Sequence, residues 1–324
     1  MKLRAPATAL LAAALVPALV LPAAATTSAS GAAATARGAA ASAGDAATST
    51  RGTAPAPLTG AAVYYAYNRG LRIDRYQPGK GFARMGVPLD NFQFSASPDG
   101  KKVAWITMRG ELKVGWGSKV TTVAKGVQAG GPCGTATWSP DSRRVAYVGA
   151  SNDDRAPVSI VNLDGTGRRA AGKTVGVCHL AWSGDGRYLA GYAGTADAVY
   201  KLDVKTGKSV KVKGISFVTH VQSLSPDGRN VIVHVVPRGE PTGDGTWPSL
   251  FTPTIVDTVT GKKVAIPVKG RLAGAFYLAD GRLVVRVAGA AHNSLVVLDA
   301  AGRKLQTLAE PAKAKEYGLL QIIP

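Results

Sequence analysis

The sequence predicts an all-β fold, a six-bladed β-propeller whose ring is closed by the C-terminal strand. Three observations support this prediction: a short turn motif recurs five times, a second turn follows it in most units, and one apolar segment is left over at the C-terminal end. The aspartates of the turn motif stand at 99, 141, 185, 227 and 280, so the intervals are 42, 44, 42 and 53 residues. Periods of about 40–45 residues are typical of four-stranded propeller blades.

The first turn motif is Ser-Pro-Asp-Gly or a close variant of it. Proline presets φ for a tight turn, aspartate accepts hydrogen bonds from the amides that follow, and glycine tolerates positive φ. Because alternating apolar residues flank it, the motif predicts a hairpin between the first two strands of each blade, strands a and b. Its five copies occupy residues 94–105, 136–147, 180–190, 223–233 and 277–285.

The second turn predicts strands c and d of the same blades. An apolar segment such as residues 296–298 precedes it, and a more polar segment such as residues 209–213 follows. The outermost strand of a blade is the most exposed, so the polar segment is expected there. The second turn falls at residues 163–167, 203–207, 257–261 and 299–302.

The two ends of the repeat region complement each other. Residues 62–67, 71–76 and 82–85 supply three strands with no strand a before them, whereas residues 317–323 form a lone apolar strand. Pairing this strand with residues 63–67 completes the first blade and closes the ring, which removes exposed sheet edges. Six blades over residues 61–324 amount to about 44 residues each.

The repeated motif, preceded by tryptophan or another apolar residue, resembles the propeller of the TolB family and of relatives with WD-like repeats. The resemblance covers residues 62–324 and implies a six-bladed propeller. TolB works with an outer-membrane translocation system and carries an additional N-terminal α/β domain, where this chain has a low-complexity stretch. Propellers host many unrelated activities, so the motif indicates the fold more specifically than the function.

The N-terminal region has the features of an export signal. Lys2 and Arg4 precede an apolar stretch, and the alanines at 23–25 offer a cleavage site. The apolar stretch is short and is interrupted by Pro17, which argues against a transmembrane segment. We therefore expect a secreted protein, extracellular or associated with the cell envelope, with a signal peptide at 1–25, a low-complexity Ala/Thr/Ser/Gly linker at 26–60 and the propeller at 61–324.

The formal net charge of +19 is spread along the chain, and the a–b and c–d turns are rich in lysine and arginine. These turns lie on the same face of a propeller. One interpretation is that turns favour solvated cations, and the other is a basic face that contacts an anionic envelope polymer or lipid. Nucleic acid is not expected, because this face lacks aromatic residues for base stacking. The residues of this predicted basic face include Lys101, Lys102, Arg143, Arg144, Arg168, Arg169, Lys262 and Lys263.

The opposite face carries the b–c loops, of which the longest is predicted at residues 236–250 in the fifth blade. Long loops on a rigid scaffold are common binding sites, so Trp247 and Arg238 are candidate ligand contacts. The alternative is that this loop packs on its own blade. Asp153 and Asp154, in another b–c loop, are further candidates but lack the spacing of a calcium loop.

His179 and His220 stand near the start of strand a in neighbouring blades, close to the mouth of the axial channel. They are interpreted either as polar residues that line the channel or as two ligands of a metal whose third ligand cannot be named. We assign no metal site and no cofactor.

The two cysteines occupy equivalent places before strand a of adjacent blades. Cys133 precedes Asp141 by eight residues and Cys178 precedes Asp185 by seven. In an oxidising compartment this equivalence predicts a disulfide between blades, and the alternative is two thiols too far apart to join.

The sequence favours a non-catalytic binding or scaffold module over an enzyme. It contains no G-x-S-x-G pentapeptide, and the expected inner strands carry no carboxylate for an axial metal. The alternative is a propeller hydrolase or lyase with a site on the loop face near His179 and His220. We expect a monomer whose partner is a protein or an anionic envelope polymer.

Overall fold

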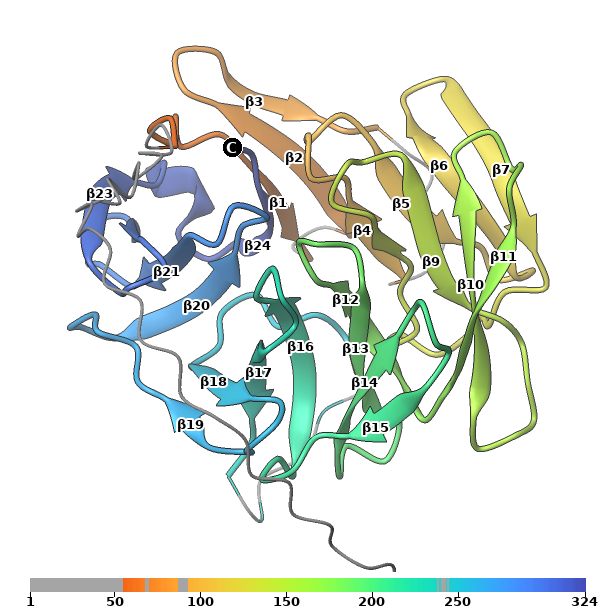
Figure 1. Ribbon diagram of the computed structural model, residues 1–324. Coiled ribbons are helices and arrows are strands. Elements are labelled where there is room, and N and C mark those ends of the chain that lie inside the picture. The colour runs from red at the N-terminus through yellow and green to blue at the C-terminus, as the bar shows by residue number, and fades with distance from the viewer. Residues whose placement is uncertain (1–54, 68–69, 87–92, 238, 240–242, 244) are drawn as a thin grey trace, which may run out of the picture. The chain divides into compact units, whose positions relative to one another are not determined.

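The computed structural model describes residues 55–67, 70–86, 93–237, 239, 243 and 245–324. These residues form six four-stranded antiparallel sheets around a common centre, so the predicted six-bladed propeller is confirmed (Figure 1). The predicted signal peptide and residues 26–54 of the predicted linker lie outside the described residues. Within the described part of the chain, no helix is long and apolar enough to span a bilayer.

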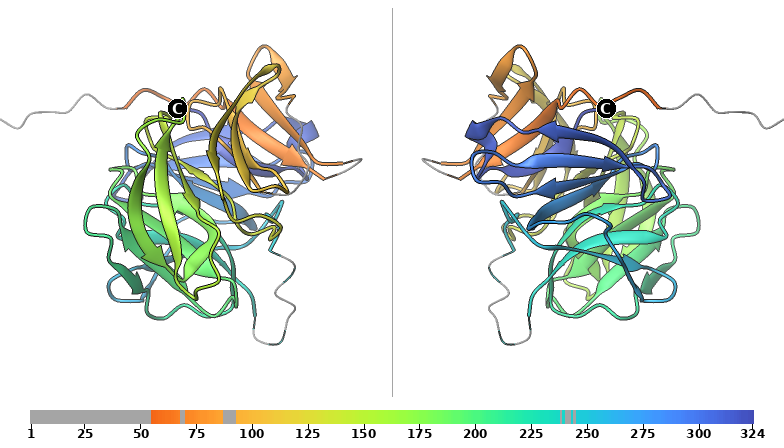
Figure 2. Two further views of the ribbon diagram at one scale, coloured as in Figure 1. Left: turned by 90° about the vertical axis from the view of Figure 1, so that its right-hand side faces the viewer. Right: turned by 90° about the vertical axis from the view of Figure 1, so that its left-hand side faces the viewer.

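Each blade follows the order a, b, c, d from the axis outwards, and neighbouring strands are twisted against one another, as is usual for antiparallel sheets (Figure 2). The first blade consists of β24 (Gly318–Ile322), β1 (Ala62–Ala66), β2 (Arg72–Gln77) and β3 (Gly81–Arg84), and the second of β4 (Phe94–Ala96), β5 (Val103–Ile106), β6 (Glu111–Trp116) and β7 (Lys119–Lys125). The third consists of β8 (Thr137–Trp138), β9 (Arg144–Val148), β10 (Ala156–Asn162) and β11 (Arg169–Thr174), and the fourth of β12 (Gly176–Trp182), β13 (Tyr188–Ala193), β14 (Val199–Asp203) and β15 (Ser209–Lys211). The fifth consists of β16 (Val218–Leu224), β17 (Asn230–Val235), β18 (Pro253–Asp257) and β19 (Lys263–Val264), and the sixth of β20 (Leu272–Tyr277), β21 (Leu283–Val287), β22 (Ser294–Leu298) and β23 (Lys304–Ala309), which the 3-10 helix η1 (Ala312–Ala314) follows.

The ring closes as predicted, with β24 as strand a of the first blade. Its antiparallel register pairs Ala62 with Ile322 and Tyr65 with Gly318. The C-terminal strand and the first strand of the propeller therefore share one sheet, and β24 supplies the inner strand of the first blade.

A buried ion pair that the sequence analysis missed reinforces this closure. Arg286 Nε and Glu310 Oε2 are 2.6 Å apart, and the side chains are 1% and 0% exposed. Tyr64 Oη donates to Glu310 Oε1 (2.8 Å), and Arg286 also donates to the carbonyls of Ala314 (2.8 Å) and Tyr317 (2.7 Å). The hydrogen bonds satisfy both charges, as a buried pair requires, and they join the sixth blade, the C-terminal segment and the first blade.

The hydrophobic core lies between neighbouring blades and not within any one of them. Between the fourth and fifth blades, for example, Tyr192, Val199, Val221 and Val233 pack together. Small branched residues fill most of these interfaces, in keeping with the low aromatic content of 6%. The inner strands are therefore held from both sides, which makes the axis a rigid place for a site.

The a–b turns have the predicted internal hydrogen bonds. In the fifth blade Asp227 Oδ1 accepts from Ser225 Oγ (2.6 Å) and from the Arg229 amide (3.0 Å). The Ser225 hydroxyl, aided by the Arg229 amide, lowers the pKa of Asp227 although partial burial opposes this. The second, third and fourth blades repeat the same two bonds.

The segment just before β1 packs on the sixth blade, although the sequence places it in the linker. Leu58 is 3% exposed, and its amide and carbonyl bond the carboxamide of Gln306 at 3.0 and 2.8 Å. The carbonyl of Ala56 accepts from Arg282 (2.8 Å). Residues 55–60 therefore contact the propeller through specific hydrogen bonds.

Candidate functional site

A pocket of about 560 Å³ lies on the propeller axis and opens on the face of the a–b turns. Pro98, Pro140, Gly184 and Ala279, all in a–b turns, surround its mouth. Every blade contributes to the wall through strand a, with Leu320, Ser95, Trp138, Ala181, Gln222 and Phe276 in blade order. The volume is that of a typical site for a small ligand or a short segment of a partner.

Trp247, between β17 and β18, forms the floor of this pocket, because its ring packs against residues of four blades at the centre of the ring. The Trp247 side chain is 7% exposed, and its ring centre lies 4.8 Å from that of His220, 5.1 Å from that of His179 and 6.4 Å from that of Phe94. Tyr65 Oη fixes the loop by donating to the carbonyl of Pro248 (2.8 Å).

Three nearly buried polar side chains at this site have polar atoms with no hydrogen-bond partner among the described residues. They are Ser95 Oγ, Gln222 Nε2 and Trp247 Nε1, on side chains that are 7%, 8% and 7% exposed. All three residues line the pocket, as does the half-buried Arg75, whose Nε also lacks a partner among the described residues. The remaining wall is mostly apolar. A buried polar group without a partner costs about 1–3 kcal/mol, so these atoms need an explanation beyond folding.

The floor rests on a chain of hydrogen bonds between buried groups. Gly245 O lies 2.9 Å from His179 Nε2, His179 Nδ1 lies 2.7 Å from His220 Nδ1, and His220 Nε2 lies 2.8 Å from the Gln222 carboxamide. Burial lowers the pKa of His220 to about 3 and that of His179 well below its ordinary value. Both imidazoles are therefore neutral at physiological pH.

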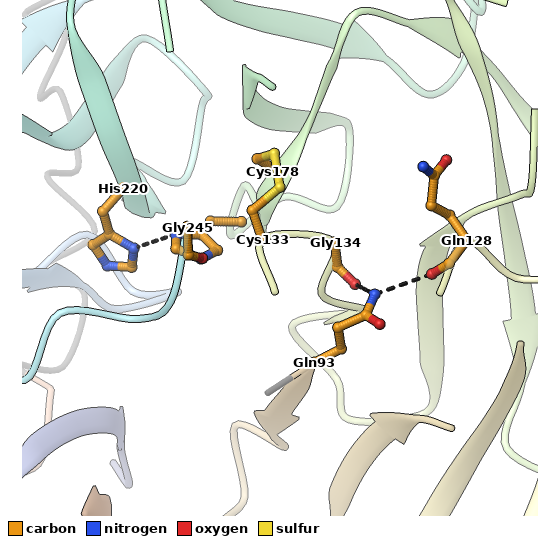
Figure 3. Close-up of a disulfide and its surroundings, with 8 residues drawn as sticks. Gln93, Gln128, Cys133, Gly134, Cys178, His220 and Gly245 are labelled. Atoms are coloured by element: carbon orange, nitrogen blue, oxygen red, sulfur yellow. Dashed lines mark hydrogen bonds between the residues drawn. A yellow bond between two sulfur atoms is a disulfide. The ribbon is translucent and has the colours of Figure 1, made fainter. Parts of the chain in front are cut away.

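The predicted disulfide between Cys133 and Cys178 is confirmed, with Cα atoms 4.6 Å apart. It lies beside Gly245, as Figure 3 shows. Next to it, His179 has a φ of 45° within an irregular part of β12, and its amide donates to the carbonyl of Cys133 (2.8 Å). A histidine in this left-handed conformation is held there by its surroundings, here the disulfide and the loop that carries Gly245.

The structure places the predicted loop-face residues differently from the sequence analysis. His179 and His220 are fully buried and Trp247 nearly so, so these three side chains do not form a site open on the loop face. The reason is that Gly245 and Trp247 of the long b–c loop pack against the imidazoles. Trp247 instead contributes to a pocket that opens on the other face.

The remaining loop-face candidates do not join this pocket. Asp153 and Asp154 are exposed between β9 and β10, where Asp153 lies 3.4 Å from Lys173 Nζ, and neither aspartate lines the pocket. Arg238 lies outside the described residues. The alternative enzymatic site near His179 and His220 would need imidazoles that a substrate can reach, and the described structure buries both.

Of the predicted basic face, only Lys101 lines the pocket. Arg144 is 3.8 Å from Asp141, and Lys102 is half-buried. Six residues of the predicted basic face are exposed and form no ion pair with the described residues. They are Lys101, Arg143, Arg168, Arg169, Lys262 and Lys263.

The sequence analysis missed Ser95 and Gln222 as site residues. Both stand in the inner strands among apolar neighbours. A polar residue in an otherwise apolar inner strand is the sequence feature that could have identified them. Which of these side chains reach the pocket depends on how the six inner strands converge, and this cannot be derived from one repeat.

Comparisons with known proteins agree with this architecture. A 53-residue stretch, 16% of this chain and 12% of the relative, is 38% identical to the Tol-Pal system protein TolB of Francisella tularensis subsp. tularensis. The crystal structure of TolB from Acinetobacter baumannii matches with a TM-score of 0.51 and 18% identity, over 79% of this chain and 65% of that chain. The chain shares the fold of the TolB propeller. It spans less than two thirds of either relative, and no protein-family model matches it.

Proposed function

We propose that this TolB-like propeller is a non-catalytic binding module whose ligand enters the axial pocket from the face of the a–b turns. The observation that carries the proposal is the group of buried polar atoms without partners on Ser95, Gln222 and Trp247 in the wall of a mostly apolar pocket. Apolar walls with a few fixed polar groups are the usual composition of a ligand site. The inner strands keep this arrangement rigid, which lowers the entropic cost of binding.

The proposed location is outside the cytoplasm, at the cell envelope or beyond it. The predicted signal peptide at 1–25 supports export, and a disulfide persists in oxidising compartments. The relative with 38% identity over the matched stretch is named as a protein of the Tol-Pal system. We expect the mature protein to begin after residue 25, which mass spectrometry of the secreted protein would test.

A blocked pocket mouth tests the binding function. Ala279 is exposed and lines the mouth, so Ala279→Trp should obstruct entry while leaving the core unchanged. Ala301 is an equally exposed alanine in the c–d turn of the same blade, away from the pocket, and Ala301→Trp is the matched control. A partner captured from the producer's envelope fraction is identified first, and its affinity for the three proteins is then measured. Loss with Ala279→Trp alone supports the proposal, and equal affinity for all three contradicts it.

The predicted basic face supports a second candidate function, the binding of an anionic envelope polymer. Exposed cations without ion pairs, such as Arg168, Arg169, Lys262 and Lys263, are the observation in its favour. Such binding weakens strongly with salt. Retention on lipoteichoic acid should fall in the quadruple Ala variant and at high salt, whereas Ala279→Trp should leave it unchanged. Retention that is insensitive to salt contradicts this function.

A further inference from the structure

From the third blade to the sixth, the c–d turn packs against the outer part of the preceding blade. A Cβ on Gly261, in the c–d turn of the fifth blade, would lie 2.7 Å from the carbonyl oxygen of Lys213, just after β15. A Cβ on Gly172, in β11, would lie 2.6 Å from the carbonyl oxygen of Gly207, in the c–d turn of the fourth blade. The φ angles of Gly261 and Gly172 are 76° and 134°, which residues with a side chain rarely adopt. Both the backbone conformation and the lack of space therefore require glycine at these contacts.

These contacts join the outer strands of five blades into one continuous surface. At one end, a Cβ on Gly165, in the c–d turn of the third blade, would lie 3.5 Å from the carbonyl oxygen of Val123 in β7. At the other end, a Cβ on Gly302, in the c–d turn of the sixth blade, would lie 3.3 Å from Pro267, which follows β19. We call this surface, made of the outer strands and c–d turns from β7 to β23, the outer rim (Figure 1). The first blade does not continue it, because no described atom outside the turn itself lies within 4 Å of a Cβ on Gly79.

The outer rim carries exposed cations in every blade that it crosses. Lys119 on β7 and Lys304 on β23 are exposed near its two ends. Between them, each of the third, fourth and fifth blades contributes two exposed cations, within the c–d turn or directly after it, that form no ion pair with the described residues. They are Arg168, Arg169, Lys205, Lys208, Lys262 and Lys263.

The carboxylates of the c–d turns are engaged within the protein. Asp203, Asp257 and Asp299 each accept a hydrogen bond at 2.9 Å from the amide two residues further on. The second oxygen of each carboxylate pairs with an arginine, at 3.0, 2.9 and 2.6 Å, and the aspartate side chains are only 16%, 12% and 18% exposed. Asp164 in the third blade is exposed, and it accepts from the amide and the hydroxyl of Thr166 (2.9 and 2.7 Å). The outer rim therefore presents mainly positive charge to the solvent.

We infer that the outer rim binds a flexible linear polyanion, which follows the curved rim across several blades. Each cation that neutralises a charge of such a chain releases a counterion, so contacts on successive blades add to the affinity. A flexible chain can bend around the third, fourth and fifth blades at once, whereas a flat bilayer meets only one part of a rim that curves away from it. This inference rests on the second candidate function and adds the location of the site and the kind of polymer.

The apolar side chains of the outer rim favour a polymer without bases. Single-stranded nucleic acids gain much of their affinity by stacking bases on aromatic side chains. The large apolar side chains that are exposed on the described part of the rim are all aliphatic. They are Val120, Val210, Val259, Val264 and Leu305. A polyanion that lacks bases is therefore the occupant that this surface fits.

Inorganic polyphosphate of different lengths tests the continuity of the rim. At equal total phosphate, a long chain should bind at least about ten-fold more tightly than tripolyphosphate, because only the long chain reaches several blades. About five contacts, each releasing about 0.7 counterion, predict a loss of affinity of about a hundred-fold between 50 and 200 mM salt. For tripolyphosphate the same calculation predicts a loss of less than about ten-fold. Fluorescence anisotropy of labelled chains measures both quantities.

Paired substitutions on two separate blades test whether one chain contacts both. The double variants R168Q/R169Q and K262Q/K263Q should each weaken binding of the long chain about three- to ten-fold, and the two losses should multiply in the quadruple variant. The matched control is R109Q/R155Q, at exposed arginines between β5 and β6 and between β9 and β10, away from the rim. It removes the same net charge as each of the other pairs. We expect it to change the affinity less than about two-fold.

The outcomes separate this inference from the second candidate function. Equal affinity for short and long chains, or an equal loss in R109Q/R155Q, would overturn the continuous rim. At equal accessible phosphate, tighter binding of poly(dT) would indicate nucleic acid, and tighter binding of phosphatidylglycerol vesicles would indicate a membrane surface; either result would overturn the inferred polymer. In all these cases a salt-sensitive retention on lipoteichoic acid would still support the second candidate function, which fails if that retention does not depend on salt.

Discussion

The two ends of the propeller axis are constructed in different ways. At the a–b turns of the second to fifth blades, the aspartate bonds a hydroxyl and an amide, each two residues away. At the b–c loops the contacts join His179 to His220 and Gly245, 41 and 66 residues away, and Tyr65 to Pro248, 183 residues away. The a–b turn end therefore consists of a local structure that repeats. The contacts at the b–c loop end occur once and form only when the ring is closed.

This difference predicts unequal sensitivity to substitution. Contacts between distant residues form only when the ring is complete, so losing one of them affects several blades. The bonds inside each a–b turn are local, so the loss of one of them leaves the internal bonds of the other turns in place.

The largest expected effect comes from the floor of the pocket. Trp247→Ala removes an indole that packs between the first, second, fourth and fifth blades, and it should lower the free energy of unfolding by about 3–5 kcal/mol. Urea unfolding followed by circular dichroism measures this loss. Trp116→Ala, at a half-buried tryptophan on β6, is the control, and a loss of the same size there would contradict the special role of the floor.

A pH titration of stability should separate the two ends. The folded pKa values of His179 and His220 lie below the ordinary value of about 6.5, so the unfolded chain takes up protons first as the pH falls. Stability should therefore decline between pH 6.5 and about 3, by about 1 kcal/mol per pH unit for each imidazole. The turn aspartates, such as Asp227 with its lowered pKa, lose their contribution only below about pH 4.

Unfolding in urea at a series of pH values measures this dependence. His220→Gln should flatten the slope between pH 6.5 and 4.5. An unchanged slope in that variant would mean that other groups cause the acid sensitivity.

The smallest expected effect is at a single turn. Asp227→Ala removes the acceptor for Ser225 Oγ and the Arg229 amide, and should cost about 1 kcal/mol. Asp153→Ala, at an exposed aspartate in a loop, should change stability by less than about 0.5 kcal/mol. Thermal melts of the two variants, measured side by side, would show how much stability one turn contributes. A loss of stability for Asp227→Ala larger than that for Trp247→Ala would contradict the expected order of the two ends.

Sequence reasoning was most successful where structure repeats. The spacing of the motif aspartates predicted the six blades, and the leftover apolar strand at residues 317–323 predicted the closure through β24. The equivalence of Cys133 and Cys178 predicted their disulfide. Each of these predictions rests on a comparison between copies of one unit, which a single sequence contains.

The same reasoning did not find the pocket. It placed Trp247, His179 and His220 on the loop face, because it treated the long b–c loop as a surface feature. It overlooked Gln222, whose place in the pocket wall depends on the other inner strands. It also overlooked the pair formed by Arg286 and Glu310, which are 24 residues apart in the chain.

The sequence by itself determined the blade, the number of blades and the strand that joins the two ends of the ring. These follow from local turn chemistry and from alternation of apolar residues, and both act over a few residues. Only the tertiary structure decided that residues 245–250 of the fifth blade fold into the ring, that two histidines become buried and neutral, and that polar side chains of two blades line one pocket. The physical reason is that burial and hydrogen-bond partnership across the axis are properties of the assembled ring, so no single repeat contains them.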